Sequence, residues 1–153
     1  MESKLIQEEG ERTFALVFET GEEVIAGLTT FAQQRRLAGS HFTGIGALSD
    51  VLLGYFEWQR KDYKRIPIRE QVEVLSLVGD IALDKGEPKV HAHVVVGRSD
   101  GTAHGGHLLE GHVRPTLEVT LTESPAQLQR RHDPASGLAL IDLTASKLRL
   151  NHS

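Results

Sequence analysis

A change of hydrophobic period near residue 40 is the feature that most limits how this chain can fold. Before it, residues 24–32 place apolar side chains at positions i, i+1, i+4, i+7 and i+8, which form one stripe of an amphipathic helix. After it, short segments alternate apolar and polar residues and are separated by turn residues. One helix followed mainly by closely connected strands predicts an α+β fold with a mostly antiparallel sheet.

About seven strands and one main helix are expected from this pattern. The helix is expected to begin with a capping box from Thr20 to Glu23 and to end by Gly39. Residues 125–132 could add one or two helical turns, and residues 144–153 form a tail that is expected to fray. The expected strands are residues 12–19, two strands within 41–58 around Ser49 and Asp50, and residues 71–83, 89–97, 116–124 and 138–143.

Length and composition exclude several classes of protein. A chain of 153 residues fits one domain over residues 1–153, with its core within about 10–143. The chain has no cysteine, so a metal would have to be bound by His, Asp or Glu. The first residues, MESKLIQEEGER, lack the apolar segment of a signal peptide, and no apolar run approaches the about 20 residues of a membrane span. We expect a cytoplasmic protein without membrane contact.

The charge of the chain argues against general affinity for nucleic acid. The net charge is −4, which gives no overall attraction to DNA or acidic membranes. The densest basic stretch, residues 60–65, lies beside Trp58 and includes Tyr63, and such a patch could hold a single strand. Because the stretch is short and isolated, we favour a solvated hairpin tip and expect DNA binding to be weak or absent.

Two glycine motifs resemble functional signatures but lack the required context. Residues 97–101 match the G-x-S-x-G pattern of a nucleophile elbow, which requires a following helix, whereas a non-helical sequence follows here. A hairpin turn is the favoured interpretation. Gly44 and Gly46 suggest a dinucleotide-binding loop, but the third glycine is missing. A strand bend or close backbone packing explains them better.

Residues 90–108 contain four of the eight histidines of the chain. If residues 90–96 form a strand, side chains two apart share a face. His91 and His93 then lie on one face and can converge on a single ion. The opposite face carries only apolar side chains and should be buried, namely Val90, Ala92, Val94 and Val96.

The position of His107 depends on the length of the next hairpin loop. A two-residue loop would place His107 opposite Val94, in the core, whereas a three-residue loop with Gly101 left-handed would place it opposite His93. We choose the three-residue loop, because the alternative pushes a histidine into the valine face. In this register His104 faces the other side and is not a ligand.

A three-histidine site is the functional prediction that follows. His91, His93 and His107 would bind a divalent metal, with zinc expected, and leave a fourth position free, as in catalytic zinc sites. Gly105 and Gly106 would leave space beside the rings for a small ligand. A hydrogen-bonded or solvent-facing cluster without metal is the alternative. The remaining histidines are interpreted as ordinary surface or core residues, namely His41, His112, His132 and His152.

Four segments taken together resemble a known family. They are GIGALSDVLLGYF from Gly44, VEVLSLVG from Val72, HAH from His91 and GGHLLEG from Gly105. In this order they resemble the PPC (plants and prokaryotes conserved) domain family, also called DUF296 or PD1-like candidate DNA-binding proteins, over roughly residues 10–143. The resemblance implies an α+β fold, a homotrimer and, in prokaryotic members, a metal at the positions of His91, His93 and His107.

Two functional hypotheses follow. The first is a homotrimeric PPC-domain protein that binds a metal and a small ligand, with enzymatic turnover left open; its candidate proton carriers are Glu57, Glu110 and His104. The second is a DNA-binding or regulatory module that acts through the trimer surface. Plant members of the family carry AT-hooks, whose Arg-Gly-Arg-Pro core is missing here, so the DNA-binding role transfers poorly.

Overall fold

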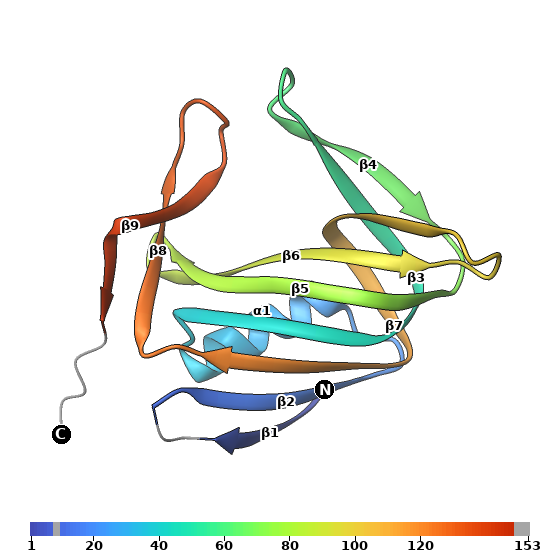
Figure 1. Ribbon diagram of the computed structural model, residues 1–153, viewed down its shortest axis with the longest axis horizontal. Helices are drawn as coiled ribbons and strands as arrows, with labels where there is room; N and C mark the ends of the chain where they lie inside the picture. The colour runs from blue at the N-terminus through green and yellow to red at the C-terminus, as the bar shows by residue number, and fades with distance from the viewer. Residues whose placement is uncertain (8–9, 149–153) are drawn as a thin grey trace.

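The computed structural model describes residues 1–7 and 10–148, which form a nine-stranded, mostly antiparallel sheet and one helix (Figure 1). The α+β class is therefore confirmed, with nine strands in place of about seven. The elements are β1 (Glu2–Gln7), β2 (Arg12–Glu19), α1 (Val24–Arg35), β3 (Gly39–Glu57), β4 (Asp62–Ile68), β5 (Val72–Asp84), β6 (Glu87–Gly97), β7 (Ala103–Glu123), β8 (Ala126–His132) and β9 (Ala139–Leu148).

Four strands pair in a closed ring. β3 pairs with β5, β5 with β6, β6 with β7, and β7 returns to β3. β1 and β2 extend the sheet from β7, and β4 pairs with the second half of β3. β8 runs parallel to the end of β5 and pairs with β9, so the C-terminal hairpin lies beside β5 and β6.

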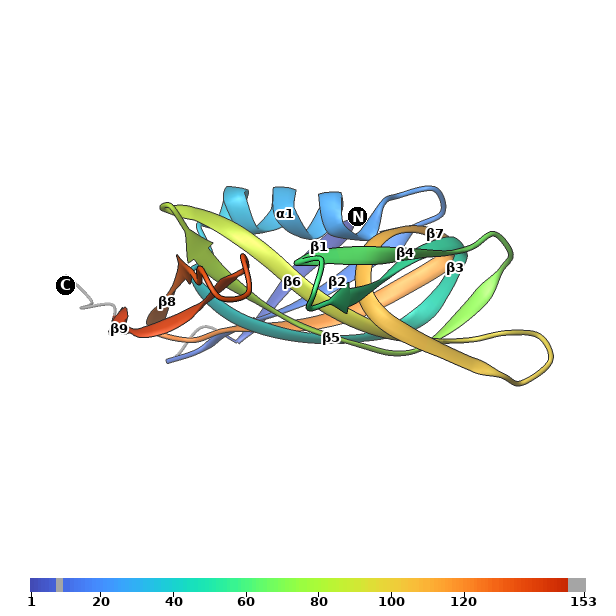
Figure 2. The ribbon, with the colours of Figure 1, turned by 90° about the horizontal axis from the view of Figure 1, so that it is seen from above.

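The helix α1 lies along one face of the sheet (Figure 2). Its apolar stripe is buried against the strands, as the sequence predicts, through Val24, Leu28, Phe31 and Ala32. Burying a side chain as large as that of Val24, Leu28 or Phe31 stabilises the fold by about 1.5–3 kcal/mol.

The ends of α1 differ from the predicted caps. Glu23 is the N-cap residue, and its carboxylate accepts hydrogen bonds from the backbone N–H groups of Ile25 (3.1 Å) and Ala26 (2.6 Å). The Thr20 hydroxyl instead donates to the Pro115 carbonyl oxygen, so the capping box is wrong. The helix ends at left-handed Arg36 (φ 53°), three residues before the predicted Gly39.

Strand β3 is continuous where two strands were predicted. It passes through Ser49 and Asp50 without a turn. Its pairing register against β7 shifts near these residues. A Cβ atom at Gly46 would lie only 2.3 Å from the Thr116 carbonyl oxygen. Close backbone packing is therefore the reason for this glycine, and the alternative to a dinucleotide loop is confirmed.

The C-terminal region also departs from the prediction. The possible helical turns in residues 125–132 are wrong, because β8 pairs with β9 on one side and with β5 at Leu83 and Asp84 on the other. β9 begins within the predicted strand 138–143 and continues to Leu148, so this part of the predicted tail is paired. The rest of the tail lies outside the described residues. Within residues 1–7 and 10–148, no helix has the length and apolar character to cross a membrane.

Candidate metal centre

The hairpin of β6 and β7 sets the geometry of the site. His93 pairs with His107, and Val96 pairs with His104. The Arg98 N–H donates to the Thr102 carbonyl oxygen (2.9 Å) and closes a three-residue loop in which Gly101 is left-handed (φ 80°). The choice of the three-residue loop is confirmed, and the G-x-S-x-G match is a turn.

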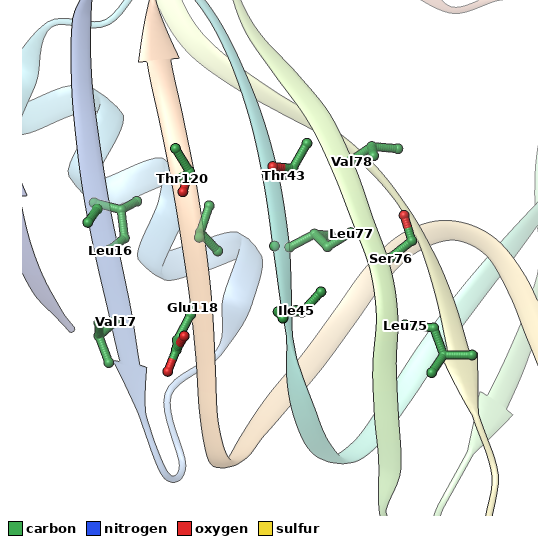
Figure 3. Close-up of a pocket in the computed structure, with 13 residues that line it drawn as sticks. Leu16, Val17, Thr43, Ile45, Leu75, Ser76, Leu77, Val78, Glu118 and Thr120 are labelled. Atoms are coloured by element: carbon green, nitrogen blue, oxygen red, sulfur yellow. The ribbon is translucent and has the colours of Figure 1, made fainter.

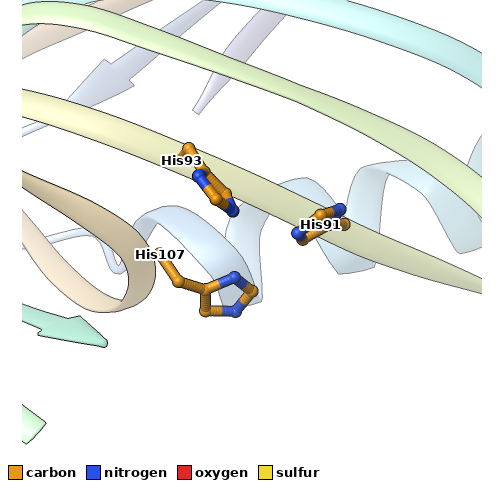
Figure 4. Close-up of side chains that lie close together, drawn as sticks. All are labelled: His91, His93 and His107. Carbon is orange, nitrogen blue, oxygen red and sulfur yellow. The ribbon is translucent and has the colours of Figure 1, made fainter. Parts of the chain in front are cut away.

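The two faces of β6 are as predicted except at Val90. Ala92, Val94 and Val96 are at most 2% exposed and belong to the core, whereas Val90 is only partly buried. His91 and His93 project from the other face, where His107 reaches them from β7, as Figure 4 shows. Three imidazoles from two neighbouring strands thus share one site.

The three rings are close enough to share an ion. One nitrogen from each of His91, His93 and His107 lies within 4.8 Å of the others. Ligands of a tetrahedral zinc ion lie about 3.4 Å apart, given Zn–N bonds of about 2.0–2.1 Å, so small side-chain rotations would close the set. The Nδ1 atom of His107 is buried and has no hydrogen-bond partner. A buried ring nitrogen without a hydrogen-bond partner is available to bind an ion, so the residues fit a metal.

The surroundings keep two of these rings neutral. Burial, with a smaller effect of the neighbouring His91 and His93, lowers the pKa of His107 from 6.5 to about 4. Burial also lowers the pKa of His93, again with a contribution from His91. Only a neutral imidazole has a lone pair for a metal, so both rings are prepared to bind one at neutral pH.

Asp80 and Arg130 support His91 from behind. Asp80 is the cross-strand partner of His91, and its Oδ2 atom lies 3.5 Å from His91 Nδ1. Arg130, from β8, donates to the other oxygen of the carboxylate. Burial raises the pKa of Asp80, but the interactions with His91 and Arg130 outweigh it and leave the pKa below its ordinary value. A carboxylate behind a metal-binding histidine fixes the orientation of the ring.

Asp80 is missing from the predicted site, although a signal for it exists. Lys85 and Gly86 both have positive φ (54° and 88°), as a two-residue type I′ turn requires. Such a turn pairs Asp84 with Glu87 and therefore Asp80 with His91. The predicted strands, residues 71–83 and 89–97, leave a longer connection between them, and this hides the pairing.

Tyr63 is a second residue that the sequence does not reveal. Its ring stacks on His107 with centroids 4.6 Å apart and planes inclined by 28°. Burial raises the pKa of Tyr63, so its hydroxyl stays protonated at neutral pH. Tyr63 lies on β4, a strand absent from the predicted set, and it limits the movement of the His107 ring.

The two glycines predicted beside a ligand are tightly packed. A Cβ atom at Gly106 would lie 2.8 Å from the Gly54 carbonyl oxygen, and one at Gly105 would lie 3.2 Å from the Val94 carbonyl oxygen. These contacts, and not open space, explain the absence of a side chain. Neither glycine lines the cavity beside the histidines.

The three predicted proton carriers lie away from the cluster. Glu57 forms an ion pair with Arg60 (3.1 Å), Glu110 lies 3.8 Å from His112, and His104 pairs with Val96 on the opposite face. None of the three belongs to the histidine group that the structure describes.

The remaining predictions concern the four other histidines and the basic stretch. His41 and His132 are exposed, and His152 lies outside the described residues. His112 contacts Asp50. The basic stretch, residues 60–65, occupies the turn and first part of β4 and is largely exposed, so the hairpin-tip interpretation is confirmed.

The chain is similar to proteins of one structural group. A family model described as the Plants and Prokaryotes Conserved (PCC) domain matches residues 6–125. A plant- and prokaryote-conserved protein of Pyrococcus horikoshii is 34% identical, with a TM-score of 0.81 over 92% of this chain and 94% of that one. A metal-containing protein of Archaeoglobus fulgidus is 27% identical, with a TM-score of 0.80 over 92% and 96% of the two chains.

Two further proteins that are similar to this chain have names that point to other functions. A candidate DNA-binding protein of Bacteroides thetaiotaomicron is 25% identical, with a TM-score of 0.84 over 93% of this chain and 98% of that one. A bifunctional protein GlmU of a Synechococcus strain is 33% identical over a match of 129 residues that covers 82% of this chain. This chain spans about a fifth of the length of that relative, since the match covers 20% of it.

Proposed function

This chain is a member of the Plants and Prokaryotes Conserved domain family, and from that premise we propose that it binds one divalent metal ion, zinc, through His91, His93 and His107. The observation that carries the proposal is the convergence of three imidazoles on one face, with the buried Nδ1 of His107 left unsatisfied. The metal-containing relative from Archaeoglobus fulgidus supports it.

A metal held by three neutral imidazoles would keep its charge of +2, and it would supply a Lewis acid that lowers the pKa of water and polarises an oxygen of a ligand. The residues of the chain position the histidines for this: Asp80 and Arg130 orient His91, and Tyr63 restrains His107. The function is binding of a small ligand at this site, with or without turnover.

A chelator competition experiment tests the metal proposal. Untagged protein and a His91/His93/His107→Ala variant are titrated with zinc against a chromophoric chelator. The wild type should compete for one zinc per chain, whereas the variant should compete for none. Equal competition by the two proteins would place the metal elsewhere.

The proposal includes a homotrimer, for which the outer sheet face offers a contact surface. Val17, Ile45, Leu75 and Val78 gather on the face away from α1 (Figure 3), and Ile45 is 62% exposed. We call these four residues the outer apolar patch. Because exposed apolar patches are often contact surfaces, we assign the trimer contact to this face. Light scattering should give three times 16.8 kDa, and Ile45→Asp should shift the mass downward. A wild-type monomer at micromolar concentration would contradict the trimer.

A DNA-binding or regulatory module is the second candidate, supported by the Bacteroides relative and its description. The net charge of −4 argues against it. Fluorescence anisotropy with duplex DNA should give a Kd no tighter than about 10⁻⁴–10⁻⁶ M at physiological salt. Nanomolar, sequence-selective binding would favour this candidate over the metal-dependent one.

A further inference from the structure

A cavity of about 170 Å³ lies between the histidines and the C-terminal hairpin. His91 and His107 form part of one wall, and Arg130 and Leu140 of β8 and β9 belong to the lining on the other side. The volume is below the roughly 300–1,000 Å³ of sites for drug-sized ligands, so the cavity suits a small molecule.

Two hairpins meet beside this cavity. The Lys61 ammonium, at the turn between β3 and β4, donates to the Pro134 carbonyl oxygen in the loop between β8 and β9 (3.1 Å). Tyr63 follows Lys61 closely in the first hairpin, and Leu138 closes the second loop. Both residues line the cavity, so the contact links two of its walls.

The charged side chains in the lining are cationic. Of the described residues, Lys89 and Arg130 line the cavity, whereas their partners Asp84 and Asp80 do not. The side chain of Arg130 is only 6% exposed, and its Nε atom is buried without a hydrogen-bond partner. The guanidinium is held in place, because Nη1 donates to the Ala139 carbonyl oxygen (3.0 Å) and Nη2 donates to Asp80.

The rest of the lining is largely apolar. Four aliphatic residues, Val90, Leu138, Ala139 and Leu140, also line the cavity. An inorganic anion would leave these aliphatic residues without an apolar partner. A neutral hydrocarbon would leave the buried Nε atom of Arg130 without a hydrogen-bond acceptor. The lining therefore combines a requirement for an acceptor beside cations with a requirement for an apolar body.

We infer that this cavity binds a small organic carboxylate with a short aliphatic body. The carboxylate is attracted by Lys89, by Arg130 and by the metal, so the inference rests in part on the proposed metal site. The aliphatic body packs against Leu138 and Leu140 of the C-terminal hairpin. This hairpin lies beyond residues 6–125, where the family model matches, so ligand choice resides in a part of the chain that the family pattern does not define.

Three probes of similar size test the ligand class. Calorimetric titration of the zinc-loaded full chain should show that 3-methylbutanoate binds at least about tenfold tighter than its neutral isostere 3-methylbutanamide, because only the acid brings a negative charge to the cations. It should also bind tighter than inorganic phosphate, which has no apolar body. Equal binding of the acid and the amide, or of the acid and phosphate, would overturn the inference.

A matched pair of variants tests the location. Leu140→Asp places a negative charge in the lining and should weaken 3-methylbutanoate binding at least about tenfold without changing the zinc content. Leu143→Asp adds the same charge on the same strand, at a residue that is 78% exposed and outside the lining, and should leave binding unchanged. Circular dichroism checks that both variants fold. Equal weakening by both variants would overturn the location.

The metal-free protein separates this inference from the proposed function. If the chain takes up no zinc, the metal site fails, and the cavity is then judged by titration of the metal-free protein alone. A preference for the acid over the amide that is lost in Leu140→Asp but kept in Leu143→Asp would support the cavity by itself. Absence of that preference in both the metal-free and the zinc-treated protein would overturn it.

Discussion

Histidines lie beside other titratable groups in two regions of this molecule, and the two surroundings have opposite effects. In the metal centre, burial is the main cause that lowers the pKa of His107 to about 4. At the junction of β3 and β7, His112 Nδ1 lies 2.9 Å from Asp50 Oδ1. The hydrogen bond with Asp50 is the main cause that raises the pKa of His112, and Glu110 adds to it.

The difference shows that histidine content alone does not make a metal site. Carboxylates next to His112 favour the imidazolium form, which has no lone pair for a metal. In the metal centre the carboxylate of Asp80 contacts His91 and is also bound by Arg130, so it orients one ring without charging the whole cluster. The predictions below test this contrast, from the largest expected effect to the smallest.

Removal of one metal-centre ring should have the largest effect. His93→Ala deletes one of three ligands and should weaken zinc binding more than about 100-fold, beyond the 10–100-fold typical of an outer partner. His112→Ala should leave zinc binding unchanged. Competition titration against a chelator measures the zinc affinity of both variants. A comparable loss of zinc affinity in the two would show that the regions of His93 and His112 do not differ in metal binding.

Removal of the carboxylate that contacts a histidine should have a smaller effect. Asp80→Asn should weaken zinc binding about 10–100-fold, because His91 loses its orienting partner. The matched change Asp50→Asn at the other region should not affect zinc. Unchanged zinc affinity in Asp80→Asn would show that the carboxylate has no positioning role.

The pH dependence of stability should have opposite signs in the two regions. Because the folded pKa of His107 is about 4 against 6.5 when unperturbed, the unfolded chain binds a proton that the folded chain refuses, and the metal-free protein should lose stability as pH falls from 6.5 towards 4. The contribution of His112 is present below its unfolded pKa and is lost as pH rises through the raised folded value. The Tm of His107→Ala should therefore fall less in acid than that of the wild type.

The smallest effect concerns a single titration. Asp50→Asn should lower the pKa of His112, because the partner that stabilises the imidazolium becomes neutral. Nuclear magnetic resonance of the imidazole protons against pH measures this shift, and the His107 titration serves as an internal control. A His112 pKa that stays raised in Asp50→Asn would assign the shift to Glu110 or Glu23 instead.

The predictable part of the structure depends on local patterns. The alternation in residues 90–96 and the left-handed Gly101 fix which side chains share a face and which residues pair, so the three-histidine cluster follows from one hairpin. The apolar stripe of α1 is equally local. These features need no information from distant parts of the chain.

The parts that were not predicted depend on contacts between residues that are far apart in the sequence. Residues 125–132 contain residues that suit a helix, but pairing with β5 and β9 makes them a strand. Arg130 reaches Asp80 across 50 residues of sequence through this pairing. Tyr63 meets His107 because β4 and β7 both pair with β3. The surroundings of the metal centre thus arise from the tertiary fold.

Zinc content in two single variants tests the central claim most directly. Untagged wild type, His107→Ala and His104→Ala are purified with zinc, dialysed and analysed by inductively coupled plasma mass spectrometry. His107 faces the cluster and His104 the opposite side of the same strand. We predict one zinc per chain in the wild type and in His104→Ala, and a large loss in His107→Ala. Equal zinc content in all three proteins would contradict the three-histidine metal centre.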